Sequence, residues 1–294
     1  MAVAPPRSLS PSKVAAFTDC ALAFRFSAID HLPEPPSPWA TKGTLVHTAL
    51  QKLLFAPPER RSVEAAIGFL AEAEREMADD PELLGLALDD EARAAFVADA
   101  EALIRRYFEL EDPARVQPIG VELLMEADIG GAWVRGIIDR LELDADGELV
   151  VTDYKTGRAP NERFERGRLA GVHVYALLCE KLLGRRPARV QLLYLADPVA
   201  IICTPSERDV RAAERRLAAV WTAVVRACAN ESFRPKPSRL CDYCAFRTYC
   251  PAFGGDPDEG RRHAAELRAR TRAEAAGQFE LELEVPLALP VAGR

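Results

Sequence analysis

Two aspartates and a lysine are the residues of this sequence with the clearest capacity for chemistry. Asp139 ends the run Gly-Ile-Ile-Asp, and Asp153 and Lys155 belong to Asp-Tyr-Lys-Thr-Gly, which follows the apolar pair Val150-Val151. Side chains alternate along a strand, so Asp153 and Lys155 point to the same side. Neighbouring strands lie about 4.8 Å apart, so carboxylates from two strands can share one cation. Mg²⁺ prefers such hard oxygen ligands, and a nearby lysine can orient an attacking water or stabilise charge on a phosphate.

An ordinary surface ion pair on a hairpin is the alternative interpretation of this pattern, because the triplet Asp-x-Lys alone is common. The surroundings favour the metal site. Asp139 precedes the triplet, an apolar strand leads into Asp153, and Thr156-Gly157 ends the segment.

Cysteines form the second cluster. Cys241, Cys244 and Cys250 lie within ten residues, a spacing that can hold a soft metal centre. A fourth ligand is needed, and Cys20 is a better candidate than His263, which falls in a polar C-terminal stretch. Spacing alone fits either zinc or an iron–sulfur cluster. The other three cysteines have apolar neighbours and are expected to be buried thiols: Cys179, Cys203 and Cys228.

Composition indicates a folded chain with an uneven charge. The chain has 294 residues, of which 49% are hydrophobic, and a net charge of −7. Residues 56–115 carry 7 Arg and 16 Asp or Glu, whereas residues 154–190 carry 9 Lys or Arg and 3 Glu. A basic face beside an acidic insertion fits a protein that touches phosphates on one side only. The alternative is that these charges merely solvate helix faces.

The sequence contains no run of about 18 apolar residues and no apolar signal-peptide core, so we expect no membrane span and a cytoplasmic protein. In a reducing compartment, clustered cysteines suggest metal binding more than disulfides.

Periodicity predicts the elements that must position these residues. We expect strands over 119–129 and 132–143, turned at Gly130-Gly131, and a third strand over 148–154 that carries Asp153. The remaining expected elements are helices over 10–30, 43–55, 163–183 and 206–229, helical segments within 62–110, and strands over 190–196 and 200–204. This pattern predicts an α/β fold.

Three segments together resemble the RecB family of PD-(D/E)XK nucleases. Gly-Ile-Ile-Asp and Asp-Tyr-Lys-Thr-Gly look like motifs II and III, and Gly43-Thr44-Leu45-Val46-His47 looks like the motif I helix. The resemblance implies a restriction-endonuclease-like central mixed sheet flanked by helices. It also implies that His47, Asp139 and Asp153 hold Mg²⁺ or Mn²⁺, that the backbone carbonyl of Tyr154 adds a ligand, and that Lys155 is the catalytic lysine.

One position departs from the family. A Gln-x-x-x-Tyr motif usually follows motif III and helps to position DNA. Tyr175 is present here, but Gly171 stands where the glutamine is expected.

The segment around Cys20, Phe17 to Arg25, resembles the N-terminal cysteine segment of nucleases that carry a [4Fe–4S] cluster, including AddB-type and CRISPR-adaptation nucleases. By this resemblance, Cys20, Cys241, Cys244 and Cys250 hold the cluster as a staple, with Zn²⁺ as the alternative. We therefore expect a nuclease domain over 8–255 with an acidic helical insertion at 56–115, followed by a flexible polar tail over 256–294.

The leading hypothesis is a metal-dependent DNA exonuclease that acts on single strands or ends in repair or recombination, with a helicase or other repair protein as the expected partner. Its expected DNA contacts are Arg158, Arg163, Arg166, Arg168 and Tyr175. A second hypothesis, motivated by Gly171, is an iron–sulfur DNA-binding subunit with little or no nuclease activity that works beside a helicase. A third is a structural protein that binds zinc.

Overall fold

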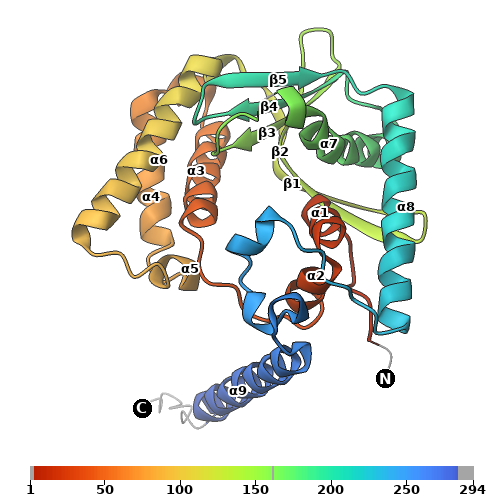
Figure 1. Cartoon of the computed structure of the whole chain (residues 1–294). Helices are drawn as coiled ribbons and strands as arrows, with labels where there is room; N and C mark the ends of the chain where they lie inside the picture. Colours follow the sequence, from red (N-terminus) through yellow and green to blue (C-terminus); the bar gives the residue numbers. More distant parts are fainter. Residues whose placement is uncertain (1–2, 161, 284–294) are drawn as a thin grey trace, which may run out of the picture. The chain divides into compact units, whose positions relative to one another are not determined.

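The chain forms two compact units in a computed structural model that describes residues 3–160 and 162–283, without the side chains of residues 162–170 and 271–283 (Figure 1). Unit 2 comprises residues 6–15 and 35–227 and contains the sheet. Unit 1 combines the N-terminal residues 1–5 and 16–34 with the C-terminal residues 228–294. The two ends of the chain therefore build unit 1 together.

The sheet of unit 2 is mixed, as expected. Its described strands are ordered β1-β2-β3-β4-β5; β3 and β4 are parallel, and the other neighbouring pairs are antiparallel. The strands are β1 (Pro118–Ile129), β2 (Ala132–Leu143), β3 (Leu149–Lys155), β4 (Arg189–Tyr194) and β5 (Val199–Cys203). Each lies within two residues of the sequence-based expectation, which is the usual uncertainty of an element's end.

Local sequence explains how β2 and β3 come together. Gly130 and Gly131 have φ angles of 61° and 81°, which glycine adopts without the steric cost that a side chain would add. They make the tight turn between β1 and β2. β3 is central and its residues Leu149 to Tyr154 are all buried, which explains its apolar start, Leu149 to Val151.

One face of the sheet packs against α7 (Glu162–Leu183) and α8 (Glu207–Ala229). This core includes Val151 of β3, Leu177 of α7 and Leu217 of α8. Residues 6–15 add Leu9, whose backbone exchanges hydrogen bonds with β2 at Trp133 and Arg135.

Helices from residues 56–115, the segment that the sequence predicted as an acidic insertion, cover the opposite face together with α3 (Figure 1). The described elements here are α3 (Pro38–Phe55), η1 (Pro58–Arg60), α4 (Val63–Glu76), α5 (Pro81–Leu84), α6 (Asp90–Leu110) and η2 (Pro113–Arg115). Their apolar faces meet Tyr154, Leu193 and Leu195 of the sheet side in a second core. The insertion therefore supports the helix that carries His47.

The expected start of the helix at residue 43 is wrong, because α3 begins at Pro38. The Ser37 side chain accepts a hydrogen bond from the Ala40 backbone N–H and caps the helix. Proline is tolerated at the first helical position, where its missing N–H would have had no intrahelical partner. Because Pro38 follows a proline-rich stretch, the sequence predicted a loop there and a later start of the helix.

The single helix expected over residues 10–30 is also wrong. The structure has α1 (Pro11–Asp19) and α2 (Ala21–Ala28), separated by Cys20 in an extended conformation with φ −159° and ψ 111°. The start at Pro11 is confirmed, and the Ser10 hydroxyl accepts a hydrogen bond from the Lys13 backbone N–H. The break turns the Cys20 region into a junction between two helices.

Unit 1 contains α2, three short 3₁₀ helices and a long C-terminal helix. These are η3 (Arg239–Tyr243), η4 (Arg247–Tyr249), η5 (Pro251–Phe253) and α9 (Pro257–Leu283). Helix α9 occupies most of the segment for which we expected a polar tail. Ala264 is fully buried, and the Arg268 guanidinium donates to the Asp30 carbonyl oxygen. The flexibility of the segment stays a prediction.

Among the described helices, none is long and apolar enough to span a bilayer.

Candidate metal centre and cysteine pocket

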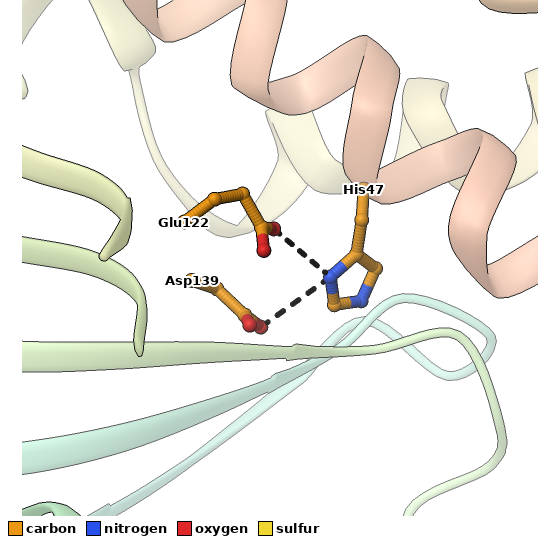
Figure 2. Close-up of side chains that lie close together, drawn as sticks. All are labelled: His47, Glu122 and Asp139. Carbon is orange, nitrogen blue, oxygen red and sulfur yellow. Dashed lines mark ion pairs between the residues drawn. The ribbon is translucent and has the colours of Figure 1, made fainter. Parts of the chain in front are cut away.

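Three side chains from three elements converge in unit 2 (Figure 2). Nδ1 of His47 lies 3.5 Å from Oε1 of Glu122 and 3.6 Å from Oδ2 of Asp139. One potential ligand atom from each residue lies within 4.8 Å of the other two. His47 comes from α3, Glu122 from β1 and Asp139 from β2, so tertiary packing brings them together.

The pairing of β2 with β3 places the two predicted aspartates next to each other. Arg140 pairs with Thr152, so Asp139 and Asp153 are the next residues beyond that pair. The Tyr154 backbone N–H donates to Oδ2 of Asp139 at 2.6 Å, which fixes the carboxylate. Lys155 forms an ion pair with Asp153 through its ammonium group. The structure thus brings the predicted residues His47, Asp139, Asp153 and Lys155 together.

Glu122 was missed by the sequence analysis. It lies in β1 with a φ of 48°, in the left-handed region that is costly for a residue with a side chain. The strand pairing on either side, Val121 with Arg140 and Leu123 with Ile138, skips it. Such strain persists only where the surroundings enforce it, and it often marks a functional position. The available signal was weak, because Glu122 is one of three acidic residues in β1, with Glu126 and Asp128.

We call His47, Glu122, Asp139, Asp153 and Lys155 the acidic site. They line a cavity of about 720 Å³ together with Gly171 and Tyr175. A cavity of this size, with a few convergent polar groups, is typical of a ligand site.

The carboxylates of the acidic site are electrostatically strained in the absence of a cation. Burial raises the pKa of Asp139 to about 7, and the nearby charge of Asp153 adds to the effect. Burial alone would lower the pKa of His47, but the hydrogen bond to Glu122 and the negative charges of Asp139, Glu122 and Asp153 outweigh it and raise the pKa. A cation bound here would relieve both effects.

The donor set of the acidic site fits a divalent cation. Carboxylate oxygens are the ligands that Mg²⁺ and Mn²⁺ prefer, and imidazole can complete the set. Asp139 is only 7% exposed and Asp153 3%, and they face one lysine. The site therefore holds more buried negative than positive charge, which a divalent ion would balance.

Tyr175 lies beside the acidic site. Burial raises its pKa, and the charges of Asp153 and Asp139 and a hydrogen bond to Asp153 raise it further. A Cβ atom on Gly136 would stand 3.1 Å from the Tyr175 ring, so glycine allows this close approach. Gly171, where the family has glutamine, has no neighbour within 4 Å of a Cβ built on it. A larger side chain would therefore find open space there.

A buried arginine supports the site from the face that α6 covers. Arg140 is fully buried and forms ion pairs with Glu111 and Glu142, and it donates to the Tyr154 hydroxyl at 2.8 Å. The Tyr154 ring in turn lies edge-on to His47, with centroids 6.0 Å apart. This network fixes the tyrosine beside His47.

In unit 1, the four predicted cysteines line one cavity of about 250 Å³. We call Cys20, Cys241, Cys244 and Cys250 the cysteine pocket. Burial raises the pKa of Cys244, and the other three thiols add to the effect, so each of them lies close to Cys244. The Ser238 backbone N–H donates to the Cys241 sulfur at 3.3 Å. Cys179 and Cys228 are buried, as expected, whereas Cys203 is half-buried.

The structure describes the side chain of only one of the four arginines that we expected to contact DNA. Arg158 is exposed just after the acidic site. The side chains of Arg163, Arg166 and Arg168 lie outside the described residues.

Comparison with solved structures identifies a similar fold. A crystal structure of a candidate exonuclease from Eubacterium rectale superposes with a TM-score of 0.54 at 13% identity, covering 81% of this chain and 87% of that one. At this identity the likeness concerns the fold, and it supports the mixed sheet with flanking helices.

Two phage proteins are similar over part of the sequence. The Gene 69 proteins of Mycobacterium phages D29 and L5 are each 29% identical over 136 residues, or 45% of this chain. The match covers 48% of the D29 protein and 44% of the L5 protein, so it spans about half the length of these curated relatives.

The family comparison covers most of the chain. Residues 8–251 match the PD-(D/E)XK nuclease superfamily, a span that includes all five residues of the acidic site and all four of the cysteine pocket. With the mixed sheet and its flanking helices, the match confirms the predicted restriction-endonuclease-like fold. The chain belongs to the PD-(D/E)XK nuclease superfamily.

Proposed function

We propose that this protein is a metal-dependent DNA nuclease that hydrolyses phosphodiester bonds at the acidic site. The observation that carries the proposal is the convergence of His47, Glu122 and Asp139 next to the Asp153–Lys155 pair. Membership in a nuclease superfamily supports the same reaction class.

In this proposal the ligands of Mg²⁺ or Mn²⁺ are His47, Glu122, Asp139 and Asp153, with the Tyr154 carbonyl as a further donor. When bound, the cation supplies Lewis-acid polarisation of a phosphoryl oxygen and lowers the pKa of a coordinated water. Lys155 is 39% exposed at its side chain, so its ammonium can reach the cavity while paired with Asp153. It would orient the attacking water or stabilise charge that develops on the phosphate.

We further propose an exonuclease that acts on single strands or DNA ends in repair or recombination. The likeness to a candidate exonuclease supports this class. Arg158 is exposed near the acidic site, and Arg163, Arg166 and Arg168 follow it in the sequence. Phosphate contacts from these residues would make binding weaken with salt. We also propose that the protein has a helicase or other repair protein as its partner and is located in a reducing cytoplasm.

Cleavage of end-labelled single- and double-stranded DNA tests the nuclease. Protein purified without oxygen is assayed with Mg²⁺, Mn²⁺ or EDTA, alongside Asp153→Ala. Asp146→Ala is the matched control, because Asp146 is exposed in the turn at the far end of the same β2–β3 hairpin. We expect metal-dependent degradation that Asp153→Ala abolishes and Asp146→Ala retains.

Full cleavage by metal-replete Asp153→Ala would overturn the assignment of the site. Metal-insensitive DNA binding without cleavage in either metal would instead favour a DNA-binding subunit beside a helicase. Gly171, in place of the family's glutamine, is the observation that keeps this second function under test.

For the cysteine pocket we propose a [4Fe–4S] cluster with a structural role. Four cysteines line one cavity, and a backbone N–H donates to one sulfur. The spacing of the cysteines fits either a cluster or zinc, and the resemblance of the Cys20 segment to nucleases with a [4Fe–4S] cluster favours the cluster.

Metal analysis of the purified protein tests this assignment. We expect brown protein with about four irons per chain, and loss of the colour in Cys244→Ser but not in Cys203→Ser. Colourless protein with one zinc per chain would contradict the cluster and favour the zinc alternative.

A further inference from the structure

Trp39 is a large aromatic side chain left in water. Its indole is 76% exposed, on the first turn of α3 directly after Pro38. Tryptophan is normally buried over most of its surface, because its large apolar area gains stabilisation on leaving water. An exposed indole close to a candidate active site therefore requires an explanation.

The indole is held from one side by a fixed cation. The Lys42 ammonium lies 4.9 Å from the ring centroid and 3.0 Å from Oδ2 of Asp99 in α6. Lys42 itself is buried, so its position is set by the packing of α3 against the insertion. A cation over a tryptophan ring is attractive. The contact restrains the ring and leaves most of its surface exposed.

Trp39 also lies on the helix ridge that leads to the acidic site. Trp39, Gly43 and His47 are spaced four residues apart, so they follow one another along the surface of α3. Eight residues of helix place Trp39 about 12 Å from His47 along the axis.

A groove runs along the same helix. It has a volume of about 440 Å³, and its lining extends from Ala40, the chain neighbour of Trp39, to His47 and Glu122 of the acidic site. Ala40, Gly43 and Thr44 are small, which leaves room for a nucleic-acid backbone to approach this part of α3.

We propose that Trp39 is a stacking platform for a nucleobase of single-stranded DNA whose scissile phosphodiester lies at the acidic site. This inference rests on the proposed nuclease function and adds to it the substrate form and a binding subsite. Every base has a flat π face, so stacking on an indole tolerates any sequence. Bases inside a duplex are covered by their neighbours. Trp39 would therefore select single strands and frayed ends.

The restraint on the ring lowers the cost of stacking a base on it. A group already held in its bound position loses little entropy on binding. The acidic insertion thus has a role in this arrangement, because Asp99 fixes the lysine that holds the indole.

Equilibrium binding of oligonucleotides in EDTA tests the platform without cleavage. Stacking on an aromatic side chain contributes about 1–3 kcal/mol per base, which converts to a loss of about 5- to 150-fold in affinity. We expect that loss for single strands in Trp39→Ala and near-normal affinity in Trp39→Phe, with no change for blunt duplex. Phe55→Ala is the matched control, because Phe55 is also an exposed aromatic residue of α3, at 69%, but lies at the opposite end of the helix from Trp39.

A scan with single abasic positions identifies the stacked base. In the wild-type protein one position should weaken binding about as much as Trp39→Ala does. In Trp39→Ala that same position should cost nothing further, because the two changes remove one interaction. Lys42→Met should give a smaller loss that disappears in the Trp39→Ala background.

The outcomes separate this inference from the nuclease proposal. Unchanged single-strand affinity in a folded Trp39→Ala protein, or equal losses for duplex and single strands, would overturn the platform even if the enzyme cleaves DNA. Loss of base-dependent binding in Trp39→Ala, in a protein that cleaves nothing, would support the platform and reject the nuclease. Matching circular dichroism and melting temperature establish that the variant is folded.

Discussion

The acidic site and the cysteine pocket are supported by different kinds of backbone. Asp139 and Asp153 stand on paired strands of a sheet that is covered on both faces, and a backbone N–H holds Asp139. The cysteine pocket is formed by the junction at Cys20 and by η3, η4 and η5, which are 3₁₀ helices of three to five residues. The backbone hydrogen bonds made by these cysteines join residues three to five positions apart.

This difference suggests how each site depends on its ligand. Sheet pairing defines the acidic site without a metal, so cation loss should remove activity and leave the fold. Short turns alone bury little apolar surface, so a group that joins four cysteines would supply much of the order of unit 1. Four predictions test this difference between the two sites.

The largest effect is expected for loss of the cysteine-bound group. In Cys244→Ser, hydrogen exchange should accelerate across residues 228–270, because structural metal centres contribute on the order of 10 kcal/mol to folding. Exchange in β2 and β3 should stay slow, and EDTA treatment that removes only Mg²⁺ should accelerate neither region. Cys203→Ser, in β5, is the control. Normal exchange across 228–270 in iron-free Cys244→Ser would show that the turns need no ligand.

The second effect is the pH dependence of the acidic site. The raised pKa values of Asp139, about 7, and of His47 mean that a cation must displace protons below about pH 7. As the pH decreases, Mn²⁺ affinity should therefore fall about tenfold per pH unit for each proton that the cation displaces. Isothermal titration between pH 6 and pH 8 measures this slope, and a flat profile would contradict the raised pKa of Asp139.

The raised pKa of Asp139 also makes the stability of the fold depend on pH. The pKa of Asp139 is raised above that of an unfolded aspartate, near 4. In the metal-free protein, the contribution of Asp139 to stability is therefore fully present below about pH 4. This contribution is lost as the pH rises through about 7. Mn²⁺ should consequently raise the melting temperature more at pH 8 than at pH 6.

The third effect concerns backbone strain at Glu122. Glu122→Ala and Glu122→Gly both remove the carboxylate and should weaken Mn²⁺ binding about tenfold or more. Only glycine adopts a φ of 48° without steric cost. Glu122→Gly should therefore be more stable than Glu122→Ala by about 1 kcal/mol in urea unfolding. Equal or reversed stabilities would mean that the residue carries no strain.

The smallest effect is expected at Gly171. Open space surrounds this position in α7, beside the acidic site. Gly171→Gln should stabilise the helix by about 0.5 kcal/mol. A hydrogen bond from the new side chain to bound DNA would raise cleavage roughly two- to tenfold. Thermal melts and cleavage rates measure the two effects, and a lower rate would show that the glutamine does not fit this site.

Much of the fold was predictable because its signals are local. Alternating and helical periodicities gave the five strands and the helices around them to within a few residues, and Gly130-Gly131 marked the tight turn. His47, Asp139, Asp153 and Lys155 were found through three short motifs, each defined by neighbours in the chain. The family match and the similar fold confirm the architecture, whereas the roles of the residues stay predictions.

The sequence by itself therefore determined which elements form and which motif residues they carry, since hydrophobic spacing and turn residues act over a few positions. Only the tertiary structure decided that Glu122 faces His47, because a left-handed residue in β1 has no periodic signal. It also decided that the Trp39 ring meets Lys42, whose ammonium pairs with Asp99 of a distant helix. Contacts of this kind depend on how helices and strands pack, and packing joins residues that no local pattern connects.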